Sequence, residues 1–218
     1  MSFADTTQEP MTSLLDLNDD CLFEIFKYLN LMETFNVLDL RNSRLTGIAR
    51  QRIATFKELN IQIRELPNFT WTQLKIIGKN LRIFSLIVGY SIPTQTVLNI
   101  IKPLCQGAAL TAQLREFSLN YVYFNEEFCQ CIGDAVTKVQ RVNLSYCQLT
   151  DEILSEFLKK CVSLRELYIL GNYTLNGDFL RNFHTPSLRT IRLELHAAWT
   201  FPLGEFKTKY PNILLITT

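Results

Sequence analysis

The sequence predicts an α/β protein, with helices at the N-terminus followed by a solenoid of parallel strands that alternate with helices. Short strand patterns recur at a nearly constant spacing from residue 56 onward, and helically spaced apolar residues follow them. Residues 13 to about 52 show helical spacing without strand alternation. The chain has 218 residues and 47% apolar content, which is enough to bury a sizeable core.

Each strand pattern opens with apolar residues at its first, fourth and sixth positions. Successive openings lie 25, 33, 25, 25, 24 and 25 residues apart, a period that indicates a repeat protein. In the longest interval, residues 103–109 add length behind a complete helix. The openings begin at Phe56, Leu81, Leu114, Val139, Leu164 and Leu188, with a last partial copy at Ile213.

Residues 139–162 show one repeat most clearly. Val142 and Leu144 point to the same side of a short strand, because strand side chains alternate. Thr150-Asp151 is a helix N-cap signal, and it precedes an amphipathic helix that ends near Cys161. The apolar face of this helix consists of Ile153, Leu154, Phe157 and Leu158.

This unit resembles the cysteine-containing leucine-rich repeat. The resemblance rests on Leu149-Thr150-Asp151 and on the pair Cys147 and Cys161, which stand at the expected places. It implies that the strands stack in parallel on the concave side of a solenoid and that the helices cover the convex side. The domain prediction is a loose N-terminus at 1–12, a helical domain at 13–55 and repeats at 56–218.

The helical domain is predicted to hold three short helices. Asn18 is a good N-cap, and Leu22, Ile25, Phe26 and Leu29 share one helix face. A second helix follows from Glu33 to Leu40 with Phe35 and Leu38 apolar, and a third carries Leu45, Ile48, Ala49 and Ile53.

The first half of this domain, strongest over Leu22 to Leu31, resembles an F-box. It departs from the usual pattern at Asn18, where a Pro is common, and it lacks the Trp typical near the motif's end, where Leu45 is closest. The resemblance implies a substrate receptor of an SCF-type cullin–RING ubiquitin ligase. The residues then expected to bind the Skp-family adaptor, and through it the cullin and RING subunits, are Leu17, Leu22, Ile25, Phe26, Leu29, Phe35 and Leu38. The alternative is that the same apolar face is internal core of a cap on the solenoid.

The third, fifth and seventh positions of each opening are predicted to face outward, since the fourth and sixth face the core. Tyr121 and Tyr146 share the eighth position of neighbouring repeats, and Tyr and Arg on a concave surface are common interface anchors. The predicted substrate-binding residues are Glu116, Tyr121, Arg141, Tyr146, Glu166, Tyr168 and Arg192. Glu116, Arg141 and Glu166 also fit a solvated stabilising stripe. His196 and Trp199 fit either a cap or this patch.

Composition excludes several partners. The formal net charge is +1, so no basic field favours nucleic acid or an anionic membrane. The most apolar window, 81–101, contains Arg82, Pro93, Gln95 and Asn99 and is not a membrane span. No secretory signal is visible, so we expect cytoplasm or nucleus and six reduced, buried cysteines.

Catalytic patterns are sparse. The sequence holds only His184 and His196 as histidines, and no nucleophile-elbow, P-loop or dinucleotide motif. Cys129-x-Cys131 lacks the further ligands of a zinc site, so buried core is expected there. We therefore predict no metal, no cofactor and no catalysis by the chain itself. The alternatives are a cytosolic leucine-rich-repeat scaffold without ligase association and, third, a cysteine-dependent enzyme.

Overall fold

The computed structural model describes residues 13–181, 183 and 185–218, and the chain divides into two compact units at Thr55 and Phe56. His184 and the predicted loose segment 1–12 lie outside the described residues. Among the described residues, no helix is both long and apolar enough to cross a bilayer.

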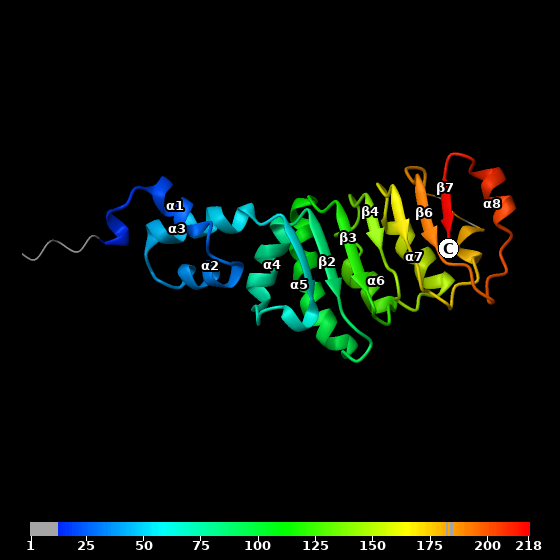
Figure 1. The fold of residues 1–218 in the computed structure, drawn as a ribbon, viewed down its shortest axis with the longest axis horizontal. Helices are drawn as coiled ribbons and strands as arrows, with labels where there is room; N and C mark the ends of the chain where they lie inside the picture. The colour runs from blue at the N-terminus through cyan, green and yellow to red at the C-terminus, as the bar shows by residue number, and fades with distance from the viewer. Residues whose placement is uncertain (1–12, 182, 184) are drawn as a thin grey trace, which may run out of the picture. The chain divides into compact units, whose positions relative to one another are not determined.

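The N-terminal unit contains a short 3₁₀ turn, Leu14–Asp16, and three helices: α1 (Asp19–Phe26), α2 (Leu31–Leu38) and α3 (Ser43–Thr55) (Figure 1). The Asn18 side chain caps α1 by accepting from the Cys21 amide at 2.8 Å. Asn30 begins α2 in the same way, through a reciprocal capping box with Glu33. These caps pair backbone groups that the helix starts leave without intrahelical partners.

A small core holds the three helices together, and its ring of half-buried neighbours includes several predicted adaptor residues. The Arg52 guanidinium adds a polar contact by donating to the carbonyls of Phe26 and Lys27 at the end of α1. The buried cluster is Leu22, Phe26, Leu45, Ile48 and Ala49, with Leu17, Phe23, Leu29, Val37 and Leu38 packed against it.

In the described part of the second unit, seven parallel strands form one sheet in chain order (Figure 1). The strands are β1 (Glu58–Gln62), β2 (Ile83–Ile87), β3 (Glu116–Asn120), β4 (Arg141–Asn143), β5 (Glu166–Tyr168), β6 (Thr190–Leu193) and β7 (Leu214–Thr217). The helices between them are α4 (Trp71–Asn80), α5 (Thr94–Thr111), α6 (Glu126–Ile132), α7 (Asp151–Lys160) and α8 (Leu203–Lys209), with 3₁₀ turns at Ile63–Glu65 and Asp178–Leu180. The predicted α/β order of helices, then parallel strands alternating with helices, is confirmed.

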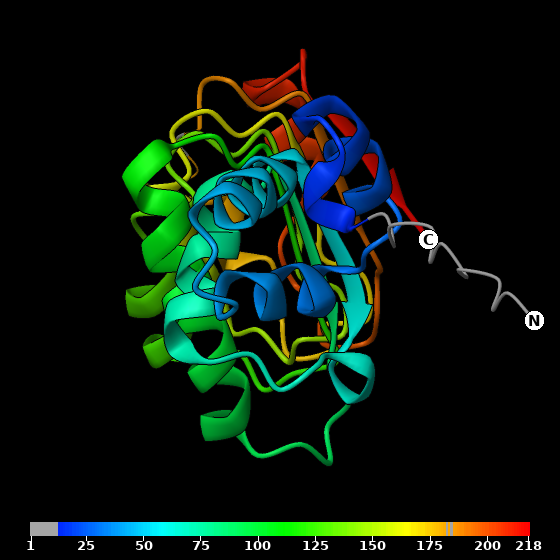
Figure 2. The ribbon, with the colours of Figure 1, turned by 90° about the vertical axis from the view of Figure 1, so that its left-hand side faces the viewer.

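The pairing register follows the predicted repeat. The third-position residues Ile83, Glu116 and Arg141 pair with one another across adjacent strands, as do the buried fourth-position residues Phe84, Phe117 and Val142. Figure 2 shows the helices of this unit along one face of the sheet. The fourth-position side chains are buried, at 3% exposure or less. In β2 and β3 the third, fifth and seventh positions are half-exposed or exposed, and they alternate with the buried ones.

Two details of the repeat prediction were wrong. The residues after Pro103 do not lie behind a finished helix, because α5 runs without a break from Thr94 to Thr111 and includes the proline. The last opening is displaced by one residue, since Leu215 and not Ile216 pairs with Ile191.

The cysteine prediction also needs one correction. All six thiols are free, and Cys105, Cys129, Cys147 and Cys161 are buried as expected. Cys131 is only half-buried, and Cys21 is exposed because it lies on the outer side of the first turn of α1.

Candidate functional site

The candidate site is the strand face, by which we mean the face of the sheet that presents the outward positions of β1–β7. At its centre, Arg141 bridges two carboxylates. Its Nη1 atom lies 2.9 Å from Glu116 Oε2 and its Nε atom 2.8 Å from Glu166 Oε2. The hydrogen bonds that Arg141 donates to Glu166 raise the pKa of Arg141, and these bonds together with the one from Tyr168 hold the pKa of Glu166 below its usual value. The stripe expected of Glu116, Arg141 and Glu166 is therefore a ladder of two ion pairs centred on Arg141.

Tyr168 connects this ladder to Arg192. The Tyr168 hydroxyl donates to Glu166 Oε2 at 2.8 Å, and the Arg192 guanidinium carbon lies 5.1 Å from the centre of the tyrosine ring. Partial burial, followed by the hydrogen bond to Glu166, raises the pKa of Tyr168. Stacking on a guanidinium and a bond to a fixed carboxylate restrict the ring, which suits a preorganised contact residue.

Tyr121 and Tyr146 stand next to each other just beyond β3 and β4. Their rings stack with centroids 4.7 Å apart and planes 4° from parallel. Both residues have positive φ, 59° and 58°, a conformation that is costly for a non-glycine residue. The turn after each strand therefore presents the tyrosine at the carboxyl edge of the sheet.

Two tyrosines that the sequence analysis missed complete this cluster. The Tyr90 ring lies 6.1 Å from Tyr121 and 5.2 Å from Tyr123, and the Tyr90 hydroxyl donates to the Tyr146 carbonyl at 2.7 Å. A recess of about 450 Å³ opens beside Tyr90 and Tyr146, and Tyr173 lines its far side. Tyr90, Tyr123 and Tyr173 all occupy the tenth position of their repeats, so reading that position down the period would have found them.

The structure brings the predicted substrate residues onto one face, in two groups. The charged group contains Glu116, Arg141, Glu166, Tyr168 and Arg192, and the aromatic group contains Tyr121 and Tyr146. Between the groups, Ser118, Asn120 and Asn143 are joined by side-chain hydrogen bonds at 2.9 and 3.3 Å. This face offers aromatic and charged side chains for binding.

Trp199 belongs to the packing of the last repeats. Its indole donates to the Phe201 carbonyl at 2.9 Å, its ring lies 6.3 Å from that of Phe179, and a Cβ on Gly177 would lie 2.7 Å from its Cζ2 atom. His196 is half-buried, with its ring 5.6 Å from that of Tyr173 at the border of the aromatic group.

The predicted adaptor residues divide by burial. Leu22, Phe26 and Phe35 are buried, at 0%, 3% and 2% exposure. Leu17, Leu29 and Leu38 are half-buried. Of the seven, Ile25 is the exposed one, at 39%. Direct contact with a partner is therefore withdrawn for Leu22, Phe26 and Phe35, because their side chains fill the interior of the folded chain.

Several apolar side chains of the N-terminal unit that were not predicted to bind the adaptor are exposed. Tyr28 is 90% exposed, and it lies in the turn that follows α1, where its amide donates to the Ile25 carbonyl at 3.1 Å. Leu14, Leu15 and Leu40 are also exposed, at 46%, 45% and 60%. An apolar surface of this kind is a candidate docking surface.

No family model matches this chain, and no curated protein matches it.

Cys129, Cys131 and Cys147 lack the features of reactive thiols. Burial raises the pKa of Cys129 and of Cys131 to about 11 and that of Cys147 to about 12, so these groups are protonated near neutral pH. In the part of the chain that the structure describes, no three His, Cys, Asp or Glu side chains are grouped as metal ligands.

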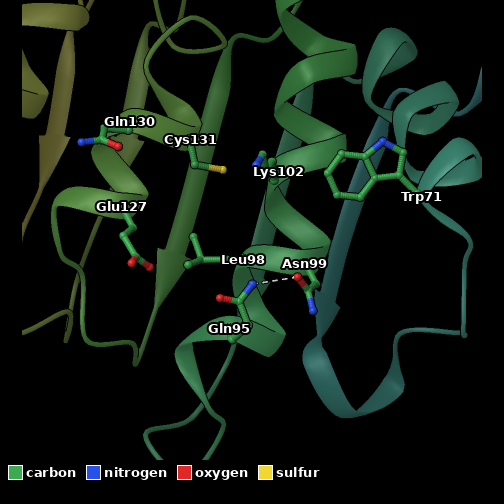
Figure 3. A pocket seen from close by; sticks show the side chains of 8 residues that line it. All are labelled: Trp71, Gln95, Leu98, Asn99, Lys102, Glu127, Gln130 and Cys131. Atoms are coloured by element: carbon green, nitrogen blue, oxygen red, sulfur yellow. Dashed lines mark hydrogen bonds between the residues drawn. The ribbon is translucent and has the colours of Figure 1, made fainter.

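On the helical side of the second unit, a groove of about 420 Å³ runs between α4, α5 and α6 (Figure 3). Trp71 lies at one end, Glu127 and Cys131 at the other, and Lys102 between them. Gln95 donates to Asn99 at 2.9 Å within it. The groove offers no nucleophile paired with a base, so the strand face remains the better candidate.

Proposed function

We propose that this chain is the substrate-recognition subunit of an SCF-type ubiquitin ligase. Residues 13–55 bind the Skp-family adaptor as an F-box, and through the adaptor they join the cullin and RING subunits. Residues 56–218 form a leucine-rich-repeat solenoid whose concave strand face binds a protein substrate. The chain has no catalytic activity of its own, and it acts in the cytoplasm or the nucleus.

The observation that carries this proposal is the exposure of two apolar side chains, Ile25 and Tyr28. Both residues fall inside the Leu22–Leu31 segment that resembles an F-box, and they remain exposed although the unit has a core of its own. A ring that is 90% exposed gains contact area only when a partner covers it. This favours docking over a purely internal role for the helices.

The strand face supports the second half of the proposal. Tyr and Arg are the residues that most often dominate the binding energy of protein interfaces. Here Tyr121, Tyr146, Tyr168 and Arg192 are held by stacking or hydrogen bonds, so little side-chain entropy is lost when a partner binds. A receptor that holds a substrate beside a transferase makes the encounter effectively intramolecular.

Capture of the adaptor tests the proposal. Tagged wild-type chain is expected to retain the Skp-family adaptor and cullin from a cell extract, and Ile25→Asp is expected to lose both. Leu22→Asp is a poor test because Leu22 is fully buried and the charge would unfold the unit. Val162→Asp is the matched control, since Val162 is apolar, 66% exposed and lies among the repeats. Equal capture by Ile25→Asp and wild type would refute the adaptor role.

One observation favours a second candidate, a leucine-rich-repeat scaffold without ligase association. Leu22 and Phe26 fill the core of the helical unit, as the helices of a simple cap would. On that view the wild-type chain captures neither adaptor nor cullin, and it still binds a partner through Tyr168 and Arg192. Capture of the adaptor therefore separates the two candidates. If the wild type and Tyr168→Ala/Arg192→Ala both capture the adaptor, the ligase candidate stands. If neither does, the scaffold candidate stands.

A further inference from the structure

A row of basic side chains runs along the amino edge of the sheet. It consists of the second residue of each repeat, and five of the six positions from β1 to β6 are basic. The backbone links them in order, since the amides of Arg82, Arg115, Gln140, Arg165 and Arg189 each donate to the carbonyl of the preceding member at 2.7 or 2.8 Å. The basic row is Lys57, Arg82, Arg115, Arg165 and Arg189, with Gln140 at the remaining position.

Strand spacing sets the geometry of the basic row. Parallel strands lie about 4.8 Å apart, so five steps span about 24 Å, the length of roughly seven extended residues. Arg82, Arg115, Arg165 and Arg189 are all exposed. The formal net charge of the whole chain is only +1, so five cations on one edge are a local concentration of charge.

The nearest carboxylates do not neutralise this row. Glu116 and Glu166 directly follow Arg115 and Arg165, yet both carboxylates are bound to Arg141. Among the described residues, no carboxylate lies within 4.0 Å of a basic nitrogen of the row, although Arg115 donates to the carbonyls of Ala112 and Leu114. The Arg141 ladder thus occupies the acids that would otherwise pair with the row.

A recess of about 130 Å³ marks the centre of the row. Arg115 and Arg165 line it on either side of Gln140, together with the three residues of the ladder. Guanidinium groups bind carboxylates and phosphates in a two-pronged geometry. The recess is therefore an anchoring point for one acidic group.

We propose that the basic row binds an acidic segment of a partner protein. A continuous phosphate backbone fits less well, because the row is interrupted at Gln140 and the Glu58 carboxylate directly follows Lys57. Tyr121 and Tyr146, which could stack on bases, lie at the opposite, carboxyl edge. A polypeptide can place neutral residues beside Gln140 and Glu58 and acidic residues beside the arginines. The inference deepens the proposed function by naming an acidic substrate, but the binding can be measured without any adaptor.

Fluorescence anisotropy with the full chain tests the proposal. The probe is a fluorescein-labelled octapeptide that alternates Glu and Ser, and the control peptide carries Gln in place of Glu. Arg115→Gln/Arg165→Gln is expected to weaken binding of the Glu peptide about fivefold. Lys102→Gln/Lys207→Gln, which removes the same charge from exposed positions on α5 and α8, is expected to leave binding unchanged.

Four outcomes would overturn the proposal: equal binding of the Gln peptide, equal loss in the Lys102/Lys207 control, an affinity insensitive to salt, or tighter binding of a fluorescein-labelled oligothymidylate. If the first double variant does not fold by circular dichroism, Arg82→Gln/Arg189→Gln tests the same row. Capture of adaptor by residues 13–55 is read separately, so failure of one proposal leaves the other standing.

Discussion

The ring of Tyr146 lies against the backbone of Gly171. A Cβ on residue 171 would stand 2.2 Å from Tyr146 Cδ1, and residue 171 has a φ of +64°. The other neighbour of this ring is Tyr121, stacked at 4.7 Å. The position of the tyrosine pair on the strand face therefore depends on the missing side chain of one glycine.

Gly171→Ala is expected to displace the Tyr146 ring and weaken binding of any partner that uses the aromatic group. The variant is also expected to lose about 1–2 kcal/mol of unfolding free energy, from the backbone conformation and the clash. Near-ultraviolet circular dichroism reports the tyrosine environment, and urea unfolding reports stability. Gly47→Ala in α3 is the control, because nothing lies within 4 Å of its Cβ position. It should keep the tyrosine signal and should not lose stability, since alanine is favoured over glycine in a helix.

A second pair of glycines lets α4 and α5 approach closely. A Cβ on Gly78 would lie 2.0 Å from the Leu104 carbonyl oxygen, and one on Gly107 would lie 2.1 Å from that of Lys75. Both obstacles are backbone atoms, which cannot move aside as a side chain can. We expect Gly78→Ala and Gly107→Ala each to lower the unfolding free energy by about 1–3 kcal/mol.

The control for the helix pair is Gly204→Ala in α8, where nothing lies within 4 Å of the added atom. In a helix, alanine is more favourable than glycine by up to about 1 kcal/mol, so this variant should be neutral or more stable. A loss of stability at Gly204 equal to that at Gly78 would remove the close approach as the explanation.

The repeat period predicted the register of β1 to β6 because inward positions alternate with outward ones, and only one alignment buries the apolar set. The period failed to predict the register of β7 because it depends on this alternation. Residues Ile213 to Ile216 are all apolar, so this run holds no alternation to fix its alignment. Pairing, with Leu214 opposite Thr190, decides the alignment there.

The candidate surfaces were predicted less completely. The basic row and the tenth-position tyrosines lie outside the strands, where alternation says nothing about direction. In α1, periodicity identified an apolar face but could not separate Leu22, which is buried, from Ile25, which is exposed. Both residues satisfy the same helical spacing, and only the packing of α3 against α1 distinguishes them.

The Thr150-Asp151 pair was predicted to mark the start of a helix, and it does. The Asp151 side chain also binds a segment about 25 residues further along the chain. Thr150 caps α7 by accepting from Ile153, while the carboxylate of Asp151 accepts from the amides of Asn176, Gly177 and Phe179 at 2.8–3.0 Å. The side chain is buried, at 6% exposure.

Asp151→Ala is expected to leave three amide donors without their acceptor and to lower the unfolding free energy by about 3 kcal/mol or more. Limited proteolysis should show faster cleavage in residues 172–181, because the carboxylate fixes that segment. Glu152→Ala, at the exposed neighbouring position, should change stability by less than about 1 kcal/mol. Cleavage elsewhere first, or no change at all, would contradict the proposed role of Asp151.

Cys147 gives a prediction for pH. Burial raises the pKa of its thiol to about 12, whereas an unfolded cysteine has a pKa of about 8.5. Above the unfolded value the unfolded chain releases the proton and the folded chain keeps it, so stability from this group is complete below about pH 8.5 and falls as pH rises toward 12. The slope is at most about 1.4 kcal/mol per pH unit.

Urea unfolding of wild type and Cys147→Ala under reducing conditions, from pH 8 to 10.5, measures this slope. The variant lacks the thiol, so the stability difference between the two proteins should shrink steadily with increasing pH, while the titration of Lys and Tyr affects both alike. Cys21→Ala is the control for a cysteine at an exposed position. If the difference between wild type and Cys147→Ala stays constant over this range, the Cys147 thiol is not held in its protonated form by burial.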